Sequence, residues 1–356
     1  MAVGQRVLVT GGAGFVGANL SIALAAEGDR EVVALDSLRR RGGELNLPRL
    51  REAGVEFVHG DVRDASDLEA VGEVDALVEC SAEPSALAGV DGGTGFVVHT
   101  NLLGAYNCLE LARRRGAQLI FLSTSRVYPT GHLNELVYAE AETRFELVEP
   151  QPLPGASRRG ISETFPLDGP RTLYGATKLA AELLVAEYAA AFGVRAVVNR
   201  CGVIAGPWQM GTVDQGVYTH WVLSHYLRRE LSYIGYGGQG KQVRDLLHVD
   251  DLVELIRDQL SRSADWADVT VNVGGGPECS LSLREATRIC ESLTGNRLEI
   301  GSTPENRPGD VPLYISDCAR LFEHCDWRPR RGPEQIVEDI FDWIQANEAS
   351  VRAALA

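Results

Sequence analysis

A tyrosine and a lysine four residues apart, Tyr174 and Lys178, could carry proton-transfer chemistry. They open an apolar helical pattern that runs to about Phe192, and this spacing places both side chains on one face of a helix. There the ammonium would stabilise the phenolate and lower the pKa of the phenol from its ordinary value of about 10, towards use as a general base. Such pairs also arise by chance. This one follows five strand–helix units and a Ser123–Thr124 pair at the fifth strand end, which strengthens the interpretation.

A glycine-rich turn near the N-terminus is the second chemical feature. An apolar run over residues 7–10 is followed by Gly11, Gly14 and Gly17 and then by a helical pattern. The N–H groups and the positive dipole end of a helix start bind phosphate. Gly11 would supply the tight turn, Gly14 the close approach of a pyrophosphate, and Gly17 the packing of helix on strand. Glycines also mark ordinary turns, but a second strand ends in Asp36 about 20 residues on, as a dinucleotide site requires.

Asp36 also bears on the choice of cofactor. Its carboxylate would accept hydrogen bonds from the adenosine ribose and repel a 2′-phosphate, which favours NAD. The arginine run 39–41 could instead bind that phosphate, so NADP stays open as the alternative. We expect NAD because the acid stands at the strand end itself.

The elements that position these residues alternate between strand and helix from about residue 5 to 125. This alternation predicts an α/β fold with a doubly wound, Rossmann-type parallel sheet. Apolar runs predict the further strands at 55–59, 76–80, 118–122 and 196–200. Ligands of such sheets lie beyond the carboxyl ends of the strands. The residues expected to line the cofactor groove are therefore Gly11, Gly14, Phe15, Val16, Asp36, Asp61, Val62, Ser81, Ala82 and Ser123.

Residues 129–172 interrupt the alternation with repeated prolines and glycines. A loop of that length in a compact enzyme is usually a lid, a binding segment or a disordered insert, and a plain surface excursion is the alternative. After residue 200 the pattern becomes mixed. We therefore expect residues 1–200 to form a dinucleotide-binding domain that carries the insert. Residues 201–356 are expected to form mainly a smaller substrate-binding lobe, with some segments returning to the sheet.

Composition restricts the partners and the compartment. The 356 residues carry a net charge of −15, which argues against a nucleic-acid or anionic membrane surface. The seven cysteines form no CxxC pair and no signal-like N-terminus precedes the first strand, so we expect reduced thiols and a cytoplasmic location. The run Glu323–Asp326 is expected to be a solvated surface turn rather than a metal site. No apolar run approaches the ~20 residues that cross a bilayer.

Together these motifs resemble an extended short-chain dehydrogenase/reductase that acts on nucleotide sugars, through nearly the whole chain. The matching motifs lie at residues 10–17, 36, 60–61, 123–124, 174–178, 206–207, 244–245 and 307–310. The resemblance implies a catalytic set of Thr124, Tyr174 and Lys178. Further cofactor contacts implied by it are Ser37, Arg40, Asn101, Tyr174, Lys178 and Cys201. The implied substrate contacts are Glu83, Thr124, Ser125, Arg126, Gln209, Arg244 and Arg307.

The resemblance further implies that Arg244 and Arg307 hold the nucleotide diphosphate, a role that suits guanidinium groups. A surface ion pair is the alternative for each arginine. Sugar 4,6-dehydratases of the family carry Thr-Asp-Glu at the fifth strand end, whereas Ser125 and Arg126 follow Thr124 here. The 4-epimerases usually place an asparagine where Val203 stands. By contrast, residues 37–47, 123–128, 171–174, 199–211, 213–216 and 241–245 are similar to CDP-paratose 2-epimerases.

The activity that this resemblance implies is inversion of C2 of a CDP-3,6-dideoxyhexose, by transient oxidation to a ketone and re-reduction with tightly bound NAD. Another nucleotide-sugar 4-epimerase or dehydratase, acting on a UDP-, GDP- or dTDP-sugar, is the first alternative. A non-catalytic NAD-binding relative is the second. The helices beginning near Asn101 and Tyr174 pair across a two-fold axis in the family, so we expect a homodimer, although their apolar faces could equally be core.

Overall fold

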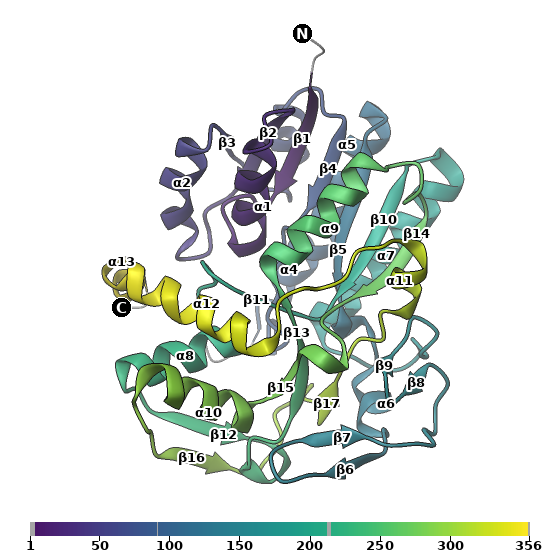
Figure 1. Cartoon of the computed structure of the whole chain (residues 1–356). Helices are drawn as coiled ribbons and strands as arrows, with labels where there is room; N and C mark the ends of the chain where they lie inside the picture. The colour runs from purple at the N-terminus through teal and green to yellow at the C-terminus, as the bar shows by residue number, and fades with distance from the viewer. Residues whose placement is uncertain (1–3, 91, 212–214, 355–356) are drawn as a thin grey trace.

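The computed structural model describes residues 4–90, 92–211 and 215–354 and centres on a seven-stranded parallel sheet (Figure 1). The strand order is β14-β10-β5-β4-β1-β2-β3, and every neighbouring pair is parallel. Its strands are β1 (Gln5–Thr10), β2 (Arg30–Asp36), β3 (Glu56–His59), β4 (Ala76–Glu79), β5 (Gln118–Thr124), β10 (Ala196–Cys201) and β14 (Val269–Val273). The predicted α/β fold with a doubly wound sheet is confirmed.

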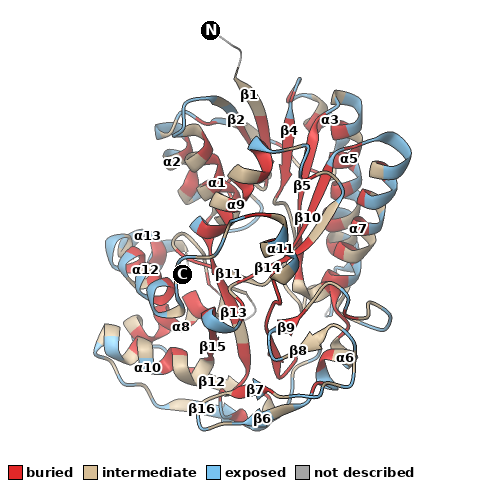
Figure 2. Ribbon diagram, turned by 45° about the vertical axis from the view of Figure 1, so that its right-hand side comes forward, coloured by how far each residue is buried: buried red, intermediate tan, exposed pale blue. Residues whose placement is uncertain are grey.

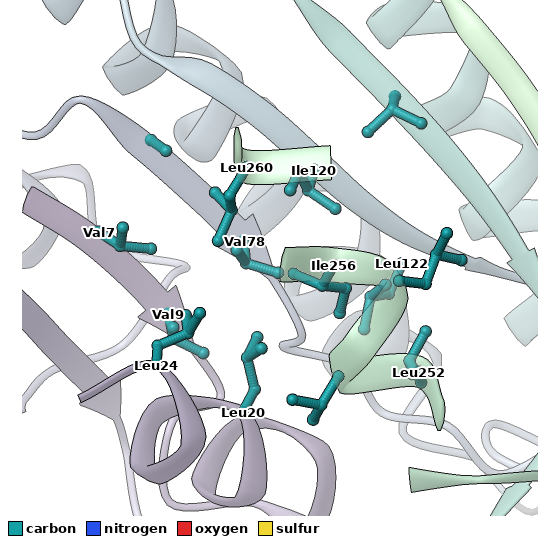
Figure 3. Packing of buried hydrophobic residues seen from close by; sticks show 14 of the residues in the cluster. Val7, Val9, Leu20, Leu24, Val78, Ile120, Leu122, Leu252, Ile256 and Leu260 are labelled. Atoms are coloured by element: carbon teal, nitrogen blue, oxygen red, sulfur yellow. The ribbon is translucent and has the colours of Figure 1, made fainter. Parts of the chain in front are cut away.

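Helices cover both faces of this sheet, which is why its strands are almost continuously apolar. On one face, α1 (Phe15–Ala25) and α9 (Val249–Ser261) pack over Val7 and Val9 (Figure 3). On the other face, α5 (Gly104–Arg115) and α7 (Leu173–Phe192) share a second core with Leu8. Successive residues of β1 therefore point to opposite faces, as the period of a strand requires. In Figure 2 the central strands β4 and β5 are correspondingly red, and the outer faces of the helices are largely pale blue or tan.

A smaller sheet lies below the carboxyl ends of the main strands in Figure 1. It contains β11 (Val203–Ala205), β13 (Val243–His248), β15 (Ser280–Ser282) and β17 (Leu313–Tyr314). Helices α8 (Val217–Leu227), α10 (Leu283–Thr294) and α12 (Pro333–Ala346) pack around a separate core that includes Trp221 and Ile340. Strand β12 (Leu231–Ile234) pairs with β16 (Ile300–Thr303). The second half of the chain also contributes α9 and β14 to the main sheet region.

Residues 129–172 are ordered and packed. They contain α6 (Thr130–Asn134), the β6 (Tyr138–Glu140) and β7 (Phe145–Leu147) hairpin, and the β8 (Ala156–Ser157) and β9 (Gly160–Ile161) hairpin. Phe145, Ile161 and Phe165 are buried in one cluster with Val243 and Leu313 of the smaller sheet. The alternatives of a disordered insert and of a plain surface excursion are therefore wrong. Apolar residues between the prolines and glycines give the segment a core. The positions of the prolines and glycines alone did not predict this core.

The remaining helices are short: α2 (Leu47–Glu52), α3 (Ala65–Glu69), α4 (Thr94–Val98), α11 (Ala319–His324) and α13 (Glu348–Ala354). The run expected to be a solvated turn instead ends α11, where the His324 ring lies 4.3 Å from the ring of buried Trp266 and Cys325 is buried. In the described part of the chain, no group of histidine, cysteine and acidic side chains could hold a metal. None of the helices described is both long and apolar enough to cross a bilayer.

Candidate active site

The first turn of α7 brings Tyr174 to the end of β5. Thr172 caps the helix by accepting a hydrogen bond from the Gly175 N–H at 3.2 Å. Gly175 then lies against the strand end so closely that a Cβ there would stand 2.0 Å from the carbonyl oxygen of Arg126. This approach places the buried Tyr174 phenol next to Thr124, whose hydroxyl interacts with it by hydrogen bonding. Residues expected to form one catalytic set are therefore brought together.

The pKa of Tyr174 is raised above its ordinary value, chiefly because the phenol is buried. The charge of Lys178 and the hydrogen bonding with Thr124 both act to lower this pKa but do not outweigh burial. The predicted lowering effect of the lysine is confirmed, but the prediction that the phenol ends with a lowered pKa is wrong because burial outweighs it. Spacing on a helix face showed the proximity of the ammonium but not the desolvation of the phenol.

Lys178 is buried and its ammonium forms an ion pair with Glu79 at the end of β4. The Nζ and Oε2 atoms are 3.0 Å apart, and Glu79 is fully buried. The ammonium also lies 4.3 Å from the centre of the Phe121 ring. Sequence reasoning missed Glu79, although an acid inside the apolar run 76–80 was a signal, because a charge is rarely buried without a partner.

Asn101 joins the loop after β4 to α7. Its amide oxygen accepts from the Glu83 N–H at 2.7 Å, and its amide nitrogen donates to the Glu83 carbonyl at 3.1 Å and to the Thr177 hydroxyl at 3.2 Å. The residue sits in a π-helical turn, His99–Leu103, a distortion common at functional sites. Asn101, expected to contact the cofactor, thus has its side chain engaged in holding Glu83 and the turn before Lys178.

The glycine loop has the geometry of an anion cradle. Gly11 has φ +64°, and a Cβ on it would stand 3.0 Å from the backbone of Cys80 and Ser81. Helix α1 begins at Phe15 with no side-chain cap of its own and no acid in its first turn, so its first N–H groups are not capped from within the helix. A Cβ on Gly17 would stand 2.1 Å from the Gly11 carbonyl oxygen, so the helix can pack this closely only with glycine there. The residues present fit a dinucleotide.

Asp36 closes the other side of this loop. Its carboxylate accepts hydrogen bonds from the Ala13 N–H at 3.1 Å and the Leu38 N–H at 2.8 Å, while burial raises its pKa. This arrangement ties the end of β2 to the glycine turn.

The remaining expected cofactor residues are distributed around this groove. Val16 is half-buried in the first turn of α1, and Ala82 is half-buried after β4. The Ser37 carbonyl lies 3.3 Å from the His59 ring nitrogen. Arg40 is near enough to Glu83 for their charges to interact, although burial lowers the pKa of Arg40.

Three expected contacts have their polar groups occupied within the protein. The Asp61 carboxylate is paired with Arg63, which lowers its pKa. The Val62 carbonyl accepts a 2.8 Å hydrogen bond from the Asn107 amide. The Ser123 hydroxyl donates to Glu182 at 2.5 Å instead of facing the groove.

A buried network supports the site from beneath. Glu182 pairs with Arg200 at 2.7 Å, and Arg200 donates to the Tyr128 hydroxyl at 3.3 Å. Cys201, the next residue of β10, is buried, and burial raises the pKa of its thiol to about 12. Its thiol is uncharged and donates a hydrogen bond to the Asn199 carbonyl, so Cys201 adds no charge to the expected cofactor groove.

Two guanidinium groups, those of Arg126 and Arg244, lie close enough together for their charges to interact. Arg126 donates to the Gly309 carbonyl at 2.9 Å, and burial lowers its pKa to about 10, with Arg244, Asp310 and Tyr174 among the charges that influence it. Arg244 pairs with Asp310 at 2.9 Å. The loop that carries Gly309 and Asp310 therefore converges with the ends of β5 and β13.

Two other expected substrate residues, Ser125 and Arg307, belong to the segments that converge here. Ser125 follows β5 directly, and Arg307 is in the converging loop, where its carbonyl accepts from the Asp310 N–H at 3.1 Å. Gln209 is held by the Ile204 carbonyl and the Thr219 hydroxyl, so its amide is committed to the protein. Val213 and Asp214, in one of the similar segments, lie outside the described residues.

Comparisons with known proteins agree with this geometry. A CDP-paratose 2-epimerase from Salmonella typhi is 29% identical over 96% of this chain and 100% of its own. A dTDP-glucose 4,6-dehydratase from Mycolicibacterium smegmatis is 30% identical over 97% of this chain and 95% of its own. The solved UDP-glucose 4-epimerase of Thermus thermophilus, in complex with NAD, is 27% identical with a TM-score of 0.76, over 96% of this chain and 99% of that one. The NAD dependent epimerase/dehydratase family matches residues 7–274, and this chain belongs to that family.

Proposed function

We propose that this protein is an NAD-dependent nucleotide-sugar epimerase that inverts C2 of a CDP-3,6-dideoxyhexose. The observation that carries the proposal is the residue set around Thr124. Tyr174 lies beside it and within the influence of the Lys178 charge, as reversible oxidation of a sugar hydroxyl needs. Where elimination would need an acid, Arg126 is held by the Gly309 carbonyl. The first alternative is a dehydratase. It is supported by the dTDP-glucose 4,6-dehydratase relatives, whose sequence identity to this chain is similar to that of the CDP-paratose 2-epimerase.

In this mechanism the protein's own residues remove one proton from the sugar hydroxyl and later return it. Tyr174 removes the proton of the sugar hydroxyl in its phenolate form, which the Lys178 charge stabilises, and the Thr124 hydroxyl orients that group. When bound, NAD⁺ would supply the hydride acceptor for oxidation of the sugar carbon, and its reduced form the donor for the re-reduction. The site must let the resulting ketone present its other face, and Tyr174 gives the proton back when the alcohol re-forms. The loop around Gly11 and Asp36 would hold the cofactor.

Arg244 and Arg307 are proposed to hold the diphosphate. In the structure Arg244 is paired with Asp310, so binding would exchange this carboxylate for phosphate oxygens. Both carboxylate and phosphate suit the planar guanidinium. We propose that the smaller lobe recognises cytosine as the nucleobase of the substrate. This part of the proposal rests only on the similarity to the CDP-paratose 2-epimerase.

A two-fold dimer is also proposed. Leu103 and Tyr106 near the start of α5, and Leu183 and Phe192 on α7, are large apolar side chains with 39–64% of their surface exposed. Helices α5 and α7 pack side by side on one face of the molecule. A second copy would cover these residues, as C₂ symmetry allows one patch to meet itself. None of the seven cysteines, all of which are described, forms a disulfide, which supports the proposed cytoplasmic location.

The function is tested with a panel of CDP-, UDP-, GDP- and dTDP-sugars, with products identified by NMR in D₂O. We expect inversion at C2 of a CDP-sugar without loss of water and without deuterium at that carbon, because the same hydride returns. Tyr174→Phe should lose at least ~10²-fold in kcat, since it removes the general base. Tyr138→Phe, at a half-buried tyrosine of the β6 hairpin, is the matched control and should keep full activity. A keto-deoxy product would show a dehydratase instead.

A further inference from the structure

Glu79 occupies an unusual position for an acid, at the end of a fully buried central strand. None of its surface is exposed, and its Oε2 atom lies 3.0 Å from Nζ of Lys178, itself 1% exposed. The other carboxylate oxygen, Oε1, has no hydrogen-bond partner among the described residues. The stabilisation of this anion in the protein therefore rests mainly on the lysine, and the two charges are mutually dependent.

The groups facing this pair from the neighbouring elements are neutral in the ordinary pH range. Cys80 directly after β4, Cys108 on α5 and Cys201 on β10 have thiol pKa values raised by burial, and Tyr174 on α7 likewise has a raised pKa. Phe121 contributes only the face of its ring. In the described structure Glu79 is the acid that meets the Lys178 ammonium; burial raises the pKa of Glu79, and the charge of Lys178 acts to lower it.

A buried ammonium without a partner tends to lose its proton, because desolvation disfavours the charged form. Here burial acts in that direction, yet the pKa of Lys178 is raised, with Glu79 the first of the opposing causes. Glu79 also acts directly to raise the pKa of Tyr174, but it ranks well behind the lowering effect of Lys178. The net effect of Glu79 on the pKa of Tyr174 therefore depends on whether Lys178 is charged.

We propose that Glu79 is a positioning residue that keeps Lys178 protonated and fixed beside Tyr174, so that the ammonium is available to stabilise the phenolate. The proton stays on Nζ, and Glu79 acts only through the lysine. This inference deepens the proposed function, but the charge state of Lys178 can be measured without any turnover.

The sequence makes that measurement simple, because Lys178 and Lys241 are its only lysines. Full-length protein labelled at the lysine side chains gives two sets of NMR signals, which Lys241→Arg assigns. We expect Lys178 in the parent protein to titrate above the ordinary lysine value of about 10.4. In Glu79→Gln, of similar size but without charge, its midpoint should fall by at least one pH unit, a tenfold loss of proton affinity. The Lys241 signal is the internal reference.

Two results would overturn the proposal. One is a Lys178 midpoint that is the same in Glu79→Gln as in the parent. The other is a parent midpoint below the ordinary lysine value, a result that does not require the variant to fold. Glu182→Gln removes a carboxylate from another buried ion pair, that with Arg200, and serves as the matched control. An equal shift in that variant would show that Glu79 has no specific role.

The pH dependence of kcat then connects the charge to activity. In Glu79→Gln the alkaline limb should move to lower pH by about the NMR shift, which a merely structural role would not produce. Turnover by both proteins with an unmoved alkaline limb contradicts the role of Glu79. If Lys178 shifts as expected but neither protein acts on any nucleotide sugar, the proposed function fails and this inference stands.

Discussion

Replacing Gly175 with alanine tests whether one backbone contact positions the proposed base. The added Cβ would stand 2.0 Å from the Arg126 carbonyl oxygen, whereas real Cβ contacts essentially never fall below 3.0 Å. The start of α7 must therefore move by at least about 1 Å relative to the end of β5. Gly175 lies next to Tyr174, so this movement displaces the phenol from Thr124.

The expected magnitudes follow from that displacement. Forcing a methyl group into a packed contact costs about 1–3 kcal/mol of stability. A misplacement of about 1 Å can cost ~10²-fold in rate, equivalent to about 2.7 kcal/mol of barrier. The glycine loop lies on other elements, so the affinity for NAD should change much less than kcat does.

The assay compares kcat, NAD affinity and the free energy of unfolding for Gly175→Ala and the parent. Gly131→Ala is the matched control, because Gly131 is also helical, in α6, and a Cβ there meets nothing within 4 Å. It should keep full activity and gain up to about 1 kcal/mol in stability, since alanine is the better helix former. A kcat of Gly175→Ala within threefold of the parent would refute the argument that this contact places Tyr174.

Three further predictions address the cofactor loop, a buried acid and the dimer. Gly17→Ala, whose Cβ would stand 2.1 Å from the Gly11 carbonyl oxygen, should weaken NAD binding at least about tenfold by calorimetry, and an unchanged Kd would count against the cradle. Burial raises the pKa of Asp245 from 3.8 to about 6, so its contribution to stability is present below pH 3.8 and lost as pH rises through 6, about 3 kcal/mol in all. Asp245→Asn should therefore gain about 2 kcal/mol relative to the parent between pH 4.5 and pH 7.5 in denaturant titrations, and a constant difference would contradict this. Leu183→Glu, at a side chain 64% exposed on α7, should sediment as a monomer, whereas a persistent dimer would place the interface elsewhere.

Much of the scaffold was predictable because its signals are local. Apolar runs identified six of the seven strands of the main sheet, since a strand covered on both faces has little room for polar residues. The seventh, β14, was not predicted, because it follows the mixed second half of the chain. The spacing of Gly11, Gly14 and Gly17 before a helix indicated a phosphate cradle, because their geometric demands come from neighbouring backbone. The same holds for Tyr174 and Lys178, which a single helix turn places together.

The properties that determine how the site works come from contacts between distant segments. Glu79 and Lys178 are 99 positions apart and meet only because β4 and α7 pack together. Phe145 and Phe165 become core only where the smaller sheet supplies Val243 to cover them.

The sequence by itself determined the succession of strands and helices in the first half of the chain, the glycine-rich turn and the pairing of Tyr174 with Lys178, because each depends on residues within a few positions of one another. Only the tertiary structure decided the charge environment of that pair. Desolvation depends on everything that surrounds a group in space, so the raised pKa of Tyr174 and the buried partner of Lys178 appear only once the chain has folded.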